Sequence, residues 1–465
     1  MTDVERPADV ESTSPRGRRI DASMPDPRVQ VRSASRTGRG GKRRARKRKR
    51  HTVAKVVLST LLVLGMVSGL AVAYLYRQLN GNLTIADYAG QIVEPAPEKV
   101  QFSGPTDPIN ILIMGEDSRD CEGCGVDGEN TAGLSDTTIL LHLSRDRKHA
   151  YGISIPRDSL VERPDCRDEE GEIIEGSSRA MWNAAFAYGG PACTISQFQH
   201  VTGIAIDYSV TVNFGGFKGM VDAVGGVDVC VPETFYDSYT KTTFKAGTRK
   251  LSGKKALAYV RVRHNIGDGS DIGRTRRQQA FIASMVSEVM SANTLANPIK
   301  VVSFLNEATK SLELAEVNTT GLGNIQELAG LALQFKNISL DKIEFITVPF
   351  VYGSGDDRGR VVWTDEADEI WERIREDRAL GDRLTAGSIR VDHLPGGEKT
   401  PTAPAGEATD GPTDEPTNQP TDEPSAGSSP SADAPTDEAP TDEASPADGR
   451  SEEEKAQLEF YGLCT

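Results

Sequence analysis

Two arginines stand two residues apart after Tyr259, at Arg261 and Arg263, with valines between them. The β-branched valines predict a strand over residues 256–263, in which side chains two apart lie on one face. Like charges on one face repel each other unless an anion lies between them. The spacing therefore indicates an anion site beside this segment.

The segment that follows carries a second set of groups suited to an anion. It reads Asp-Ile-Gly-Arg-Thr-Arg-Arg-Gln-Gln from Asp271, and we expect a helix over residues 274–291. Arg274 and Gln278 are four apart and share a face of that helix, while Asp271 lies near its N-terminus, where backbone N–H groups also bind anions. Guanidinium groups bind phosphate oxygens through paired hydrogen bonds. We interpret both segments as a phosphate or pyrophosphate site; surface arginines paired with the chain's many acids are the alternative.

Polar residues also flank other apolar runs of the chain. Asp117 and Arg119 come after a run that ends in glycine, Asp136 precedes the next run, and Arg157 follows a third. Ligands of open α/β sheets bind at strand ends, so these side chains can converge on one site. Solvated turn residues are the alternative for each of them taken alone.

Arginines around a pyrophosphate, together with aspartates for a hard divalent cation, indicate phosphoryl-transfer chemistry. The sequence contains no Walker A motif, kinase signature, G-x-S-x-G or H-E-x-x-H. These residues by themselves therefore predict a phosphate-handling enzyme without naming its substrate.

Short apolar runs alternate with helix-like stretches between residues 106 and 390. Runs that are short and rich in β-branched residues are typical of strands, which we expect at 109–114, 137–143, 150–155, 208–213, 227–231, 256–263 and 343–348. We expect helices at 183–188, 194–202, 216–224, 274–291, 298–312 and 366–376. This order predicts an α/β domain with a mixed central β-sheet flanked by helices.

Residues 56–76 form an uncharged apolar stretch that is long enough to cross a membrane as one helix. Residues 42–50 are almost all lysine or arginine. Positive charge next to a spanning helix stays on the cytoplasmic side of the membrane. We therefore expect a single-pass protein of the cell membrane, with a cytoplasmic N-terminus and an extracytoplasmic catalytic domain. A cleaved signal peptide is the alternative for the apolar stretch, and a nuclear signal or nucleic-acid patch is the alternative for the basic run.

The net charge of -15 is unevenly distributed, because the beginning of the chain is basic and its end is acidic. Neither the Arg/Ser/Pro-rich beginning nor the acidic stretch with its recurring Pro-Thr-Asp-Glu can bury enough apolar surface to fold. We expect a disordered cytoplasmic tail at 1–55, a transmembrane helix at 56–76, a stalk at 77–105, the α/β domain at 106–390, a disordered acidic tail at 391–456 and a C-terminal segment at 457–465.

All six cysteines follow the apolar stretch, as an oxidising location predicts: Cys121, Cys124, Cys166, Cys193, Cys230 and Cys464. Cys121 and Cys124 form a C-x-x-C pair, which we interpret as part of a structural disulfide. Zinc binding or redox chemistry is the alternative, although no second C-x-x-C or histidine pair completes a zinc site. The even count permits three bridges without fixing their pairing. A bridge back to the domain is one reason for Cys464 to lie beyond the acidic tail.

The chain resembles the LytR-CpsA-Psr family of cell-wall glycopolymer ligases in a series of segments that occur in the family's order: NILIMGEDSR, LSDTTILL, ISIPRDSL, NAAFAYGG, VNFGGF, VDAVGGVDV, LSGKKALAYVRVR and DIGRTRRQQ. The resemblance covers roughly residues 107–290. It implies an α/β core with an apolar pocket for a polyprenyl chain, and a Mg²⁺ cofactor. It also implies a phosphotransferase that moves a glycopolymer with its phosphate from a polyprenyl-pyrophosphate carrier to peptidoglycan or, in some members, to a protein.

By motif position, the resemblance assigns Mg²⁺ to Asp117 and Asp136. It implies that Arg157, Arg261, Arg263, Arg274 and Gln278 bind the pyrophosphate head group. Asp271 would support these arginines. The cation and the arginines would offset charge as the phosphoanhydride breaks under attack by an acceptor hydroxyl. Asp136 is also a candidate base.

Two positions depart from the family pattern. Leu134 stands where the family usually has Arg in R-S-D, and Met181 stands where it usually has Lys in K-I-N. Both changes remove positive charge from the head-group site, and Arg119 and Arg179 are candidates to replace it.

Three other functions fit parts of the sequence: a hydrolase of polyprenyl pyrophosphate, a wall-associated scaffold that binds lipid phosphates without turnover, and a membrane-bound transcription attenuator. We expect no nucleic-acid partner, because the basic tail carries no helix-turn-helix pattern. The wealth of Arg, Ala, Gly and Asp is typical of a high-GC genome and fits an actinobacterial wall polymer.

Overall fold

The computed structural model describes residues 50–88, 90–104, 106–116, 135–168, 170–319, 322–396 and 450–465, without the side chains of Arg50, His51, Asp136 and Lys336. Its α-helices are α1 (Arg50–Asn82), α2 (Ala184–Thr202), α3 (Phe214–Val224), α4 (Gly253–Arg261), α5 (Asp271–Met290), α6 (Ala292–Leu295), α7 (Pro298–Ser311), α8 (Ile325–Gln334), α9 (Asp365–Arg375) and α10 (Glu452–Phe460). Short 3-10 helices lie at Phe335–Asn337, Leu340–Lys342 and Gly355–Asp357.

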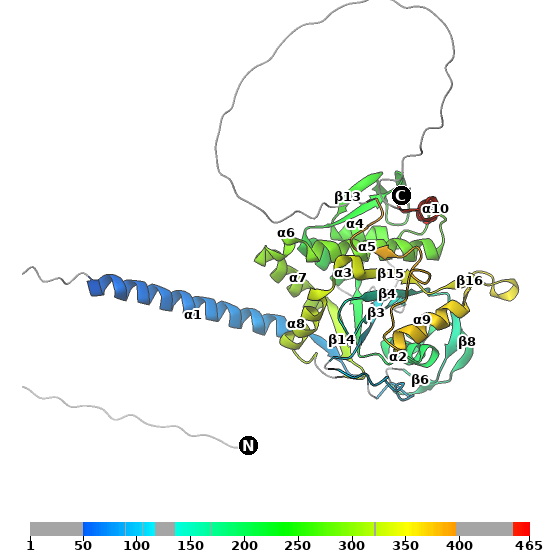
Figure 1. Cartoon of the computed structure of the whole chain (residues 1–465), viewed down its shortest axis with the longest axis horizontal. Helices are drawn as coiled ribbons and strands as arrows, with labels where there is room; N and C mark the ends of the chain where they lie inside the picture. The colour runs from blue at the N-terminus through cyan, green and yellow to red at the C-terminus, as the bar shows by residue number, and fades with distance from the viewer. Residues whose placement is uncertain are drawn as a thin grey trace, which may run out of the picture. The chain divides into compact units, whose positions relative to one another are not determined.

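An eight-stranded sheet forms the centre of the domain (Figure 1). Its order is β1 (Thr84–Ala86), β14 (Leu312–Glu316), β9 (Tyr208–Asn213), β2 (Ile109–Glu116), β3 (Ser135–Leu143), β4 (Ala150–Ile155), β15 (Ile343–Thr347) and β18 (Ile389–Arg390). Strand β2 is antiparallel to β3 and parallel to β9, while β4 is antiparallel to β3 and parallel to β15. The predicted mixed sheet is therefore confirmed.

Helices cover both faces of this sheet, because successive strand residues point to opposite sides. Leu112 and Met114 of β2 belong to one buried cluster with Phe198 of α2 and Trp371 of α9. Ile111 of β2 belongs instead to a cluster that contains residues of α5 and α10. The predicted flanking of the sheet by helices is confirmed (Figure 1).

Besides the central sheet, the described residues form two-stranded antiparallel sheets. They are β5 (Leu160–Arg163) with β8 (Ser177–Met181), β6 (Cys166–Arg167) with β7 (Ile173–Ile174), β10 (Val227–Val231) with β13 (Gly247–Leu251), β11 (Phe235–Asp237) with β12 (Thr242–Phe244), and β16 (Phe350–Tyr352) with β17 (Val361–Trp363).

Most predicted elements are found with small changes of bounds. The strands expected at 109–114, 137–143, 150–155, 208–213, 227–231 and 343–348 are β2, β3, β4, β9, β10 and β15. The two helices expected at 183–188 and 194–202 lie on either side of a kink in α2, where Gly189 and Gly190 leave the helical conformation before Pro191. Proline lacks the N–H that the helix interior needs, so it accompanies the kink.

The strand expected at 256–263 is wrong, because residues 253–261 form helix α4. Lysine, alanine and leucine dominate its first turns and favour a helix. Gly253, Ala256 and Leu257 are buried at the spacing of one helical face, while Arg261 is the last helical residue. The face shared by Arg261 and Arg263 was inferred from a strand that does not exist.

The helix expected at 298–312 ends one residue earlier, at Ser311, and strand β14 begins at Leu312. Strand β14 pairs with β9 on one side and with β1 on the other. The segment expected as a stalk thus contributes β1, an edge strand of the central sheet.

Helix α1 is the one helix, among the residues that the structure describes, that is long and apolar enough to cross a membrane. The qualifying stretch is Thr52–Asn82, and its most apolar part is not buried by the protein. By length and composition, this helix is a candidate for a single-pass membrane anchor near the N-terminus. Residues from Ser68 onward belong to the same compact unit as the α/β domain.

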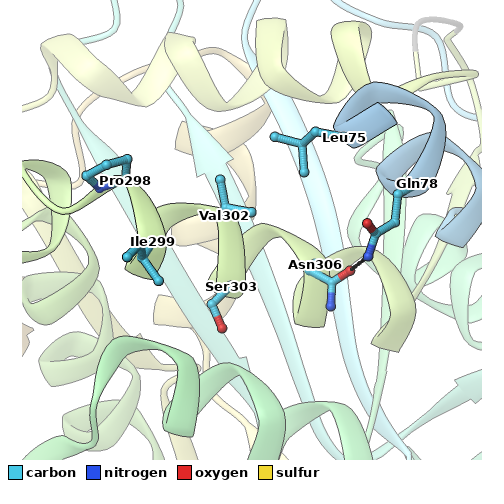
Figure 2. A pocket seen from close by; sticks show the side chains of 7 residues that line it. All are labelled: Leu75, Gln78, Pro298, Ile299, Val302, Ser303 and Asn306. Atoms are coloured by element: carbon cyan, nitrogen blue, oxygen red, sulfur yellow. Dashed lines mark hydrogen bonds between the residues drawn. The ribbon is translucent and has the colours of Figure 1, made fainter. Parts of the chain in front are cut away.

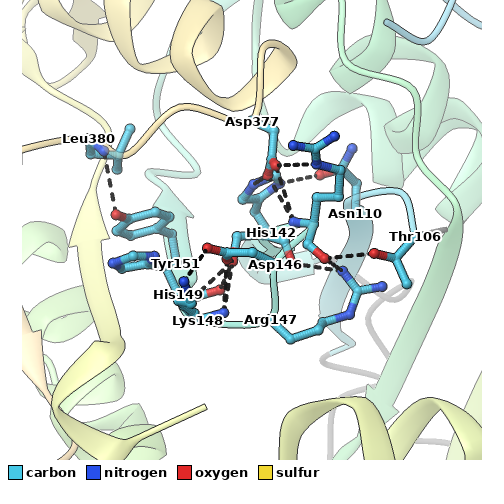
Figure 3. A network of polar contacts seen from close by, with 12 residues as sticks. Thr106, Asn110, His142, Asp146, Arg147, Lys148, His149, Tyr151, Asp377 and Leu380 are labelled. Carbon is cyan, nitrogen blue, oxygen red and sulfur yellow. Dashed lines mark hydrogen bonds and ion pairs between the residues drawn. The ribbon is translucent and has the colours of Figure 1, made fainter. Parts of the chain in front are cut away.

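A buried polar network ties the sheet to the end of α9, far from the strand ends discussed below (Figure 3). His142 of β3 lies with Nδ1 2.8 Å from Oδ1 of Asn110 in β2 and with Nε2 3.4 Å from Oδ1 of Asp377. The backbone N–H of Arg145 donates to both oxygens of Asp377, at 3.1 and 3.2 Å. These contacts hold β2 and β3 in register at the start of β2.

Candidate active site at one edge of the sheet

Strand ends meet at one edge of the sheet, as the sequence predicted. The parallel strands β2 and β9 end there, with Glu116 paired to Asn213. Strand β3 begins there at Ser135, opposite Glu116, and the parallel strands β4 and β15 end there at Ile155 and Thr347. Arg157 follows the end of β4 at this edge, and Asp136 belongs to the start of β3.

A β-bulge interrupts the pairing of β2 with β3 at this edge. Gly115 lies opposite Thr137 and Glu116 lies opposite Ser135, so Asp136 is an extra residue on β3. Bulges change the direction of a strand and are common beside active sites. The backbone of Asp136 is therefore at the edge where the site is expected.

The segment between β2 and β3 lies outside the described residues. It contains the predicted ligand Asp117, the candidate Arg119 and the family departure Leu134. The side chain of Asp136 is likewise not described. The assignment of Mg²⁺ to Asp117 and Asp136 therefore stays a prediction.

Asp271 joins two arginines from different elements. Its Oδ1 lies 3.2 Å from Nε of Arg157, which follows β4, and 2.8 Å from Nη2 of Arg274, one turn along α5. Ser270 precedes Asp271 and accepts a hydrogen bond from the N–H of Gly273, which fixes the start of α5. The structure thus brings Arg157, Asp271 and Arg274 together, as the support role predicted for Asp271 requires.

The charges in this cluster are partly shielded from water. The Arg274 side chain is 2% exposed, and a guanidinium so buried needs a carboxylate partner. Burial raises the pKa of Asp271 above its ordinary 3.8, while Arg274, Arg157 and Arg263 act in the opposite direction. Arg263 therefore lies close enough for its charge to act on Asp271, although the strand predicted for it does not exist.

Arg261 lies against two aromatic rings. Its guanidinium carbon is 4.5 Å from the ring centre of Phe214 and 5.9 Å from that of Tyr239. Phe214 begins α3 directly after β9, and Tyr239 lies between β11 and β12. Cation–π contacts of this kind favour a fixed position of the guanidinium. The sequence gave no local signal for either ring, because both come from elsewhere in the chain.

Gln278 links three elements with its side-chain amide. Its Nε2 donates to the carbonyl of Val260 in α4 at 3.1 Å. Its Oε1 accepts a hydrogen bond of 3.1 Å from Oγ1 of Thr137 in β3. Gln278 therefore fixes α4 and α5 against the edge of the sheet, next to the bulge at Asp136.

Arg277 was not predicted as a site residue, although it is fully buried. Its Nη2 donates to the carbonyl of Val262 at 2.8 Å, and its Nη1 donates to the carbonyl of Tyr461 at 3.0 Å. Burial lowers the pKa of this guanidinium. The residue connects α5 to the loop between α4 and α5 and to the C-terminal segment. The sequence shows consecutive arginines but not which of them points inward.

Arg179 lies in β8 and pairs with the carboxylate of Asp357. Its side chain is 56% exposed. Met181, the second family departure, is also in β8 and pairs with Leu160 of β5. The expectation that Arg179 replaces a lost charge at the head-group site stays a prediction.

Two disulfides lie among the described residues: Cys166 pairs with Cys193, and Cys230 pairs with Cys464. The bridge from Cys464 back to the domain is therefore confirmed. Cys121 and Cys124 fall in the segment outside the described residues.

The C-terminal segment packs against the loop that carries Arg263. The N–H of Asp268 in this loop donates to the carbonyl of Phe460 at 2.9 Å. Gly267 has a φ of +59°, and a Cβ there would lie 2.5 Å from the backbone nitrogen of Gly462. Only glycine permits an approach this close at such a φ. The C-terminal segment thus supports the loop between α4 and α5 from outside the site.

Comparison with known proteins identifies the family. The model of the LytR_cpsA_psr family matches residues 75–376. The chain belongs to the LytR-CpsA-Psr family.

Particular relatives are similar over much of this region. The probable cell wall biosynthesis protein LcpB of Corynebacterium glutamicum is 32% identical over 280 residues, which are 59% of this chain and 61% of LcpB. The polyisoprenyl-teichoic acid–peptidoglycan teichoic acid transferase TagV of Bacillus subtilis is 29% identical over 306 residues, which are 64% of this chain and 71% of TagV. A solved LytR-Csp2A-Psr enzyme from Actinomyces oris matches 64% of this chain and 97% of its own, with 21% identity and a TM-score of 0.47.

Proposed function

We propose that the protein transfers a glycopolymer, with its phosphate, from a polyprenyl-pyrophosphate carrier to a hydroxyl of peptidoglycan. The observation that carries this proposal is the cluster of Arg157, Asp271 and Arg274 at the sheet edge, with Arg263 close by. Family membership supports it, as does the similarity to TagV, whose name describes transfer of teichoic acid from a polyisoprenyl carrier to peptidoglycan. A protein acceptor is the alternative within the same chemistry.

The arginines account for the choice of a pyrophosphate donor. Each guanidinium can bind two phosphate oxygens, and several of them offset the charge that develops as a phosphoanhydride breaks. Arg157 and Arg274 share Asp271, which limits their repulsion before the donor binds. Arg261, held by Phe214 and Tyr239, adds a third guanidinium from α4.

The reaction forms one P–O bond and breaks another. The acceptor hydroxyl oxygen attacks the phosphorus attached to the glycan, and the bond from that phosphorus to the bridging oxygen breaks. Polyprenyl monophosphate leaves, and the hydroxyl proton passes to a base, for which Asp136 is the candidate. The product carries the glycan on peptidoglycan through a phosphodiester.

Mg²⁺ fits the donor set proposed for it, because aspartate carboxylates are the oxygen ligands that this cation prefers. Asp117 and Asp136 would hold it, and the bulge places the backbone of Asp136 at the sheet edge. When bound, the cation would neutralise phosphate charge beside the arginines.

We further propose that the N-terminus is cytoplasmic and that the domain lies outside the membrane. The basic run at 42–50 precedes α1, and cytoplasmic flanks of spanning helices are rich in such charge. The two described disulfides, which form in oxidising locations, support the same orientation.

The test uses the full chain in lipid vesicles with Mg²⁺, a polyprenyl-pyrophosphate glycan and a peptidoglycan oligomer. Arg157→Ala is compared with Arg383→Ala, a matched control whose guanidinium pairs with Glu366 and Glu369 on the surface. We expect a phosphodiester-linked product with the parent and with the control. We expect the rate with Arg157→Ala to be lower by roughly 100-fold, as for loss of one group that stabilises a transition state.

Other products would select another function. Polyprenyl monophosphate with free glycan phosphate, in the presence of peptidoglycan, would indicate a hydrolase. Donor binding that depends on Arg157 without turnover would indicate a scaffold, with Leu134 and Met181 as the reason for the lost activity.

A further inference from the structure

The last turns of α1 lie against α7, and side chains of the two helices line an open apolar hollow (Figure 2). The hollow has a volume of about 510 Å³. It is lined by Leu75 and Gln78 of α1 and by Pro298, Ile299, Val302, Ser303 and Asn306 of α7. All of these residues belong to the compact unit that contains the domain.

The polar contacts between these helices occur at one end of the hollow. Nδ2 of Asn82 donates to Oδ1 of Asn306 at 3.2 Å and to Oγ1 of Thr309 at 3.4 Å. Nε2 of Gln78 donates to the same oxygen of Asn306 at 3.0 Å. Earlier residues of α7, such as Ile299, line the hollow with Leu75. The end of α1 therefore bonds to the end of α7, and their earlier residues meet in the apolar part.

Helix geometry places the start of α7 beside the apolar stretch of α1. Ten residues of helix rise about 15 Å, which is the span from Thr309 back to Ile299. The same rise along α1 leads from Asn82 back to the region of Val72, inside the stretch that is long and apolar enough to cross a membrane. Ile299 is thus about level with residues that are expected to contact lipid.

Large apolar side chains are exposed at this level. Ile299 is 80% exposed, Leu295 of α6 is 61% exposed and Val72 of α1 is 67% exposed. Tyr74 and Tyr76 are exposed on α1 at the same height, and tyrosine favours the boundary between lipid and water. The order of groups along both helices, from amides to aliphatic side chains, is the order met on passing from water into a bilayer.

We propose that the corner between α6 and α7 forms a second membrane contact, in which Leu295 and Ile299 enter the lipid leaflet beside α1. The partner is the acyl-chain and headgroup region of the bilayer in which α1 is embedded. An amphipathic surface of this kind reaches about 5–10 Å into the boundary between headgroups and acyl chains. The contact restricts rotation of the domain about its anchor, and thereby fixes the height and direction of the arginine cluster above the membrane.

The test measures lipid contact and does not depend on any activity. The full chain is reconstituted in vesicles with and without lipids brominated in their acyl chains, which quench tryptophan that touches them. Ile299→Trp is compared with Ile173→Trp, a matched control because Ile173 is 59% exposed on the β6–β7 hairpin. The native tryptophans are the same in both variants, so their emission is subtracted with the parent protein.

We expect brominated lipid to reduce the emission of the tryptophan at position 299 about twofold and to leave that at position 173 unchanged, because only the former reaches the acyl chains. Equal emission from the Ile299→Trp protein in both kinds of vesicle would overturn the proposal. A blue-shifted emission at position 299 that brominated lipid does not reduce would also overturn it, since a second protein surface would then cover the corner. Both variants must first show the same thermal unfolding midpoint as the parent. We expect this because both positions are exposed, and substitutions at exposed positions change stability little.

Discussion

Replacing Cys230 and Cys464 together by serine is expected to destabilise the protein and to loosen the loop that carries Arg263. The bridge closes a loop with a sequence separation of 234 residues. The loop-closure entropy of an unfolded chain of this length corresponds to a loss of about 5.5 kcal/mol in the free energy of unfolding. The C-terminal segment would then be joined to the domain only by residues 397–449, and its contacts with Asp268 and Arg277 would open first.

The matched control removes the other described bridge by replacing Cys166 and Cys193 with serine. That bridge has a sequence separation of 27 residues, for which the same relation gives about 3.5 kcal/mol. Both variants are therefore less stable than the parent in urea unfolding. They differ in hydrogen exchange: the N–H of Asp268 loses its acceptor only when the segment containing Phe460 detaches. We expect faster exchange over residues 262–270 in the first variant alone.

Two results would refute this reasoning. An unfolding free energy within about 1 kcal/mol of the parent would show that the bridge does not constrain the unfolded chain as the entropy model requires. Unchanged exchange over residues 262–270 would show that noncovalent contacts hold the C-terminal segment without Cys464.

Three substitutions test other parts of the structure by urea unfolding. Gly267→Ala places a Cβ 2.5 Å from the backbone nitrogen of Gly462 at a φ of +59° and is expected to cost about 1–3 kcal/mol; an unchanged midpoint would contradict the packing described. Tyr259→Phe removes a buried hydroxyl without a hydrogen-bond partner among the described residues, so stability is expected to stay the same or to rise, and a loss above about 1 kcal/mol would reveal a missed partner. Asp271→Asn tests the raised pKa of Asp271. Because the folded protein holds the proton of this carboxyl more tightly than the unfolded chain does, Asp271 stabilises the fold at pH values below its ordinary pKa of 3.8. This stabilisation is lost as pH rises through the pKa of Asp271 in the folded protein. The variant should therefore gain stability relative to the parent as pH rises from about 4, and a pH-independent difference would contradict the shift.

The central strands were predictable because their signal is local. Runs such as 150–155 combine short length with β-branched residues, and burial of such a run on both faces leaves few other arrangements. Which strands pair with one another was harder to predict, because strands that are neighbours in the sheet, such as β2 and β9, are far apart in the chain. Strand β14 was missed because the preceding helix was expected to continue through Leu312, which is the first residue of this strand.

The structure brings part of the predicted arginine cluster together, although one of the two arguments for the cluster was wrong. The helix that begins at Asp271 exists, and it brings Arg274 to Arg157 through a shared carboxylate. The strand proposed for Arg261 and Arg263 does not exist, because the valines between them were weighed above the lysine, alanine and leucine before them. The charge pattern of residues 261–278 predicts an anionic ligand whichever element carries it.

Contacts between distant segments could not be predicted from local pattern. Phe214 and Tyr239 surround Arg261 from two other parts of the chain. Arg277 is flanked by arginine and glutamine, and only the fold shows that it reaches Tyr461 across the domain. Such contacts depend on which segments the topology brings together, and the sequence carries no short-range sign of them.

The central claim is tested most directly by following the phosphorus atom that is attached to the glycan. The full chain in vesicles is given a polyprenyl-pyrophosphate donor with radioactive phosphorus at that position, together with a peptidoglycan oligomer. We predict that the label enters peptidoglycan as a phosphodiester, while the released polyprenyl monophosphate is unlabelled. Label found only in water-soluble glycan phosphate, or retained in the lipid, would contradict it.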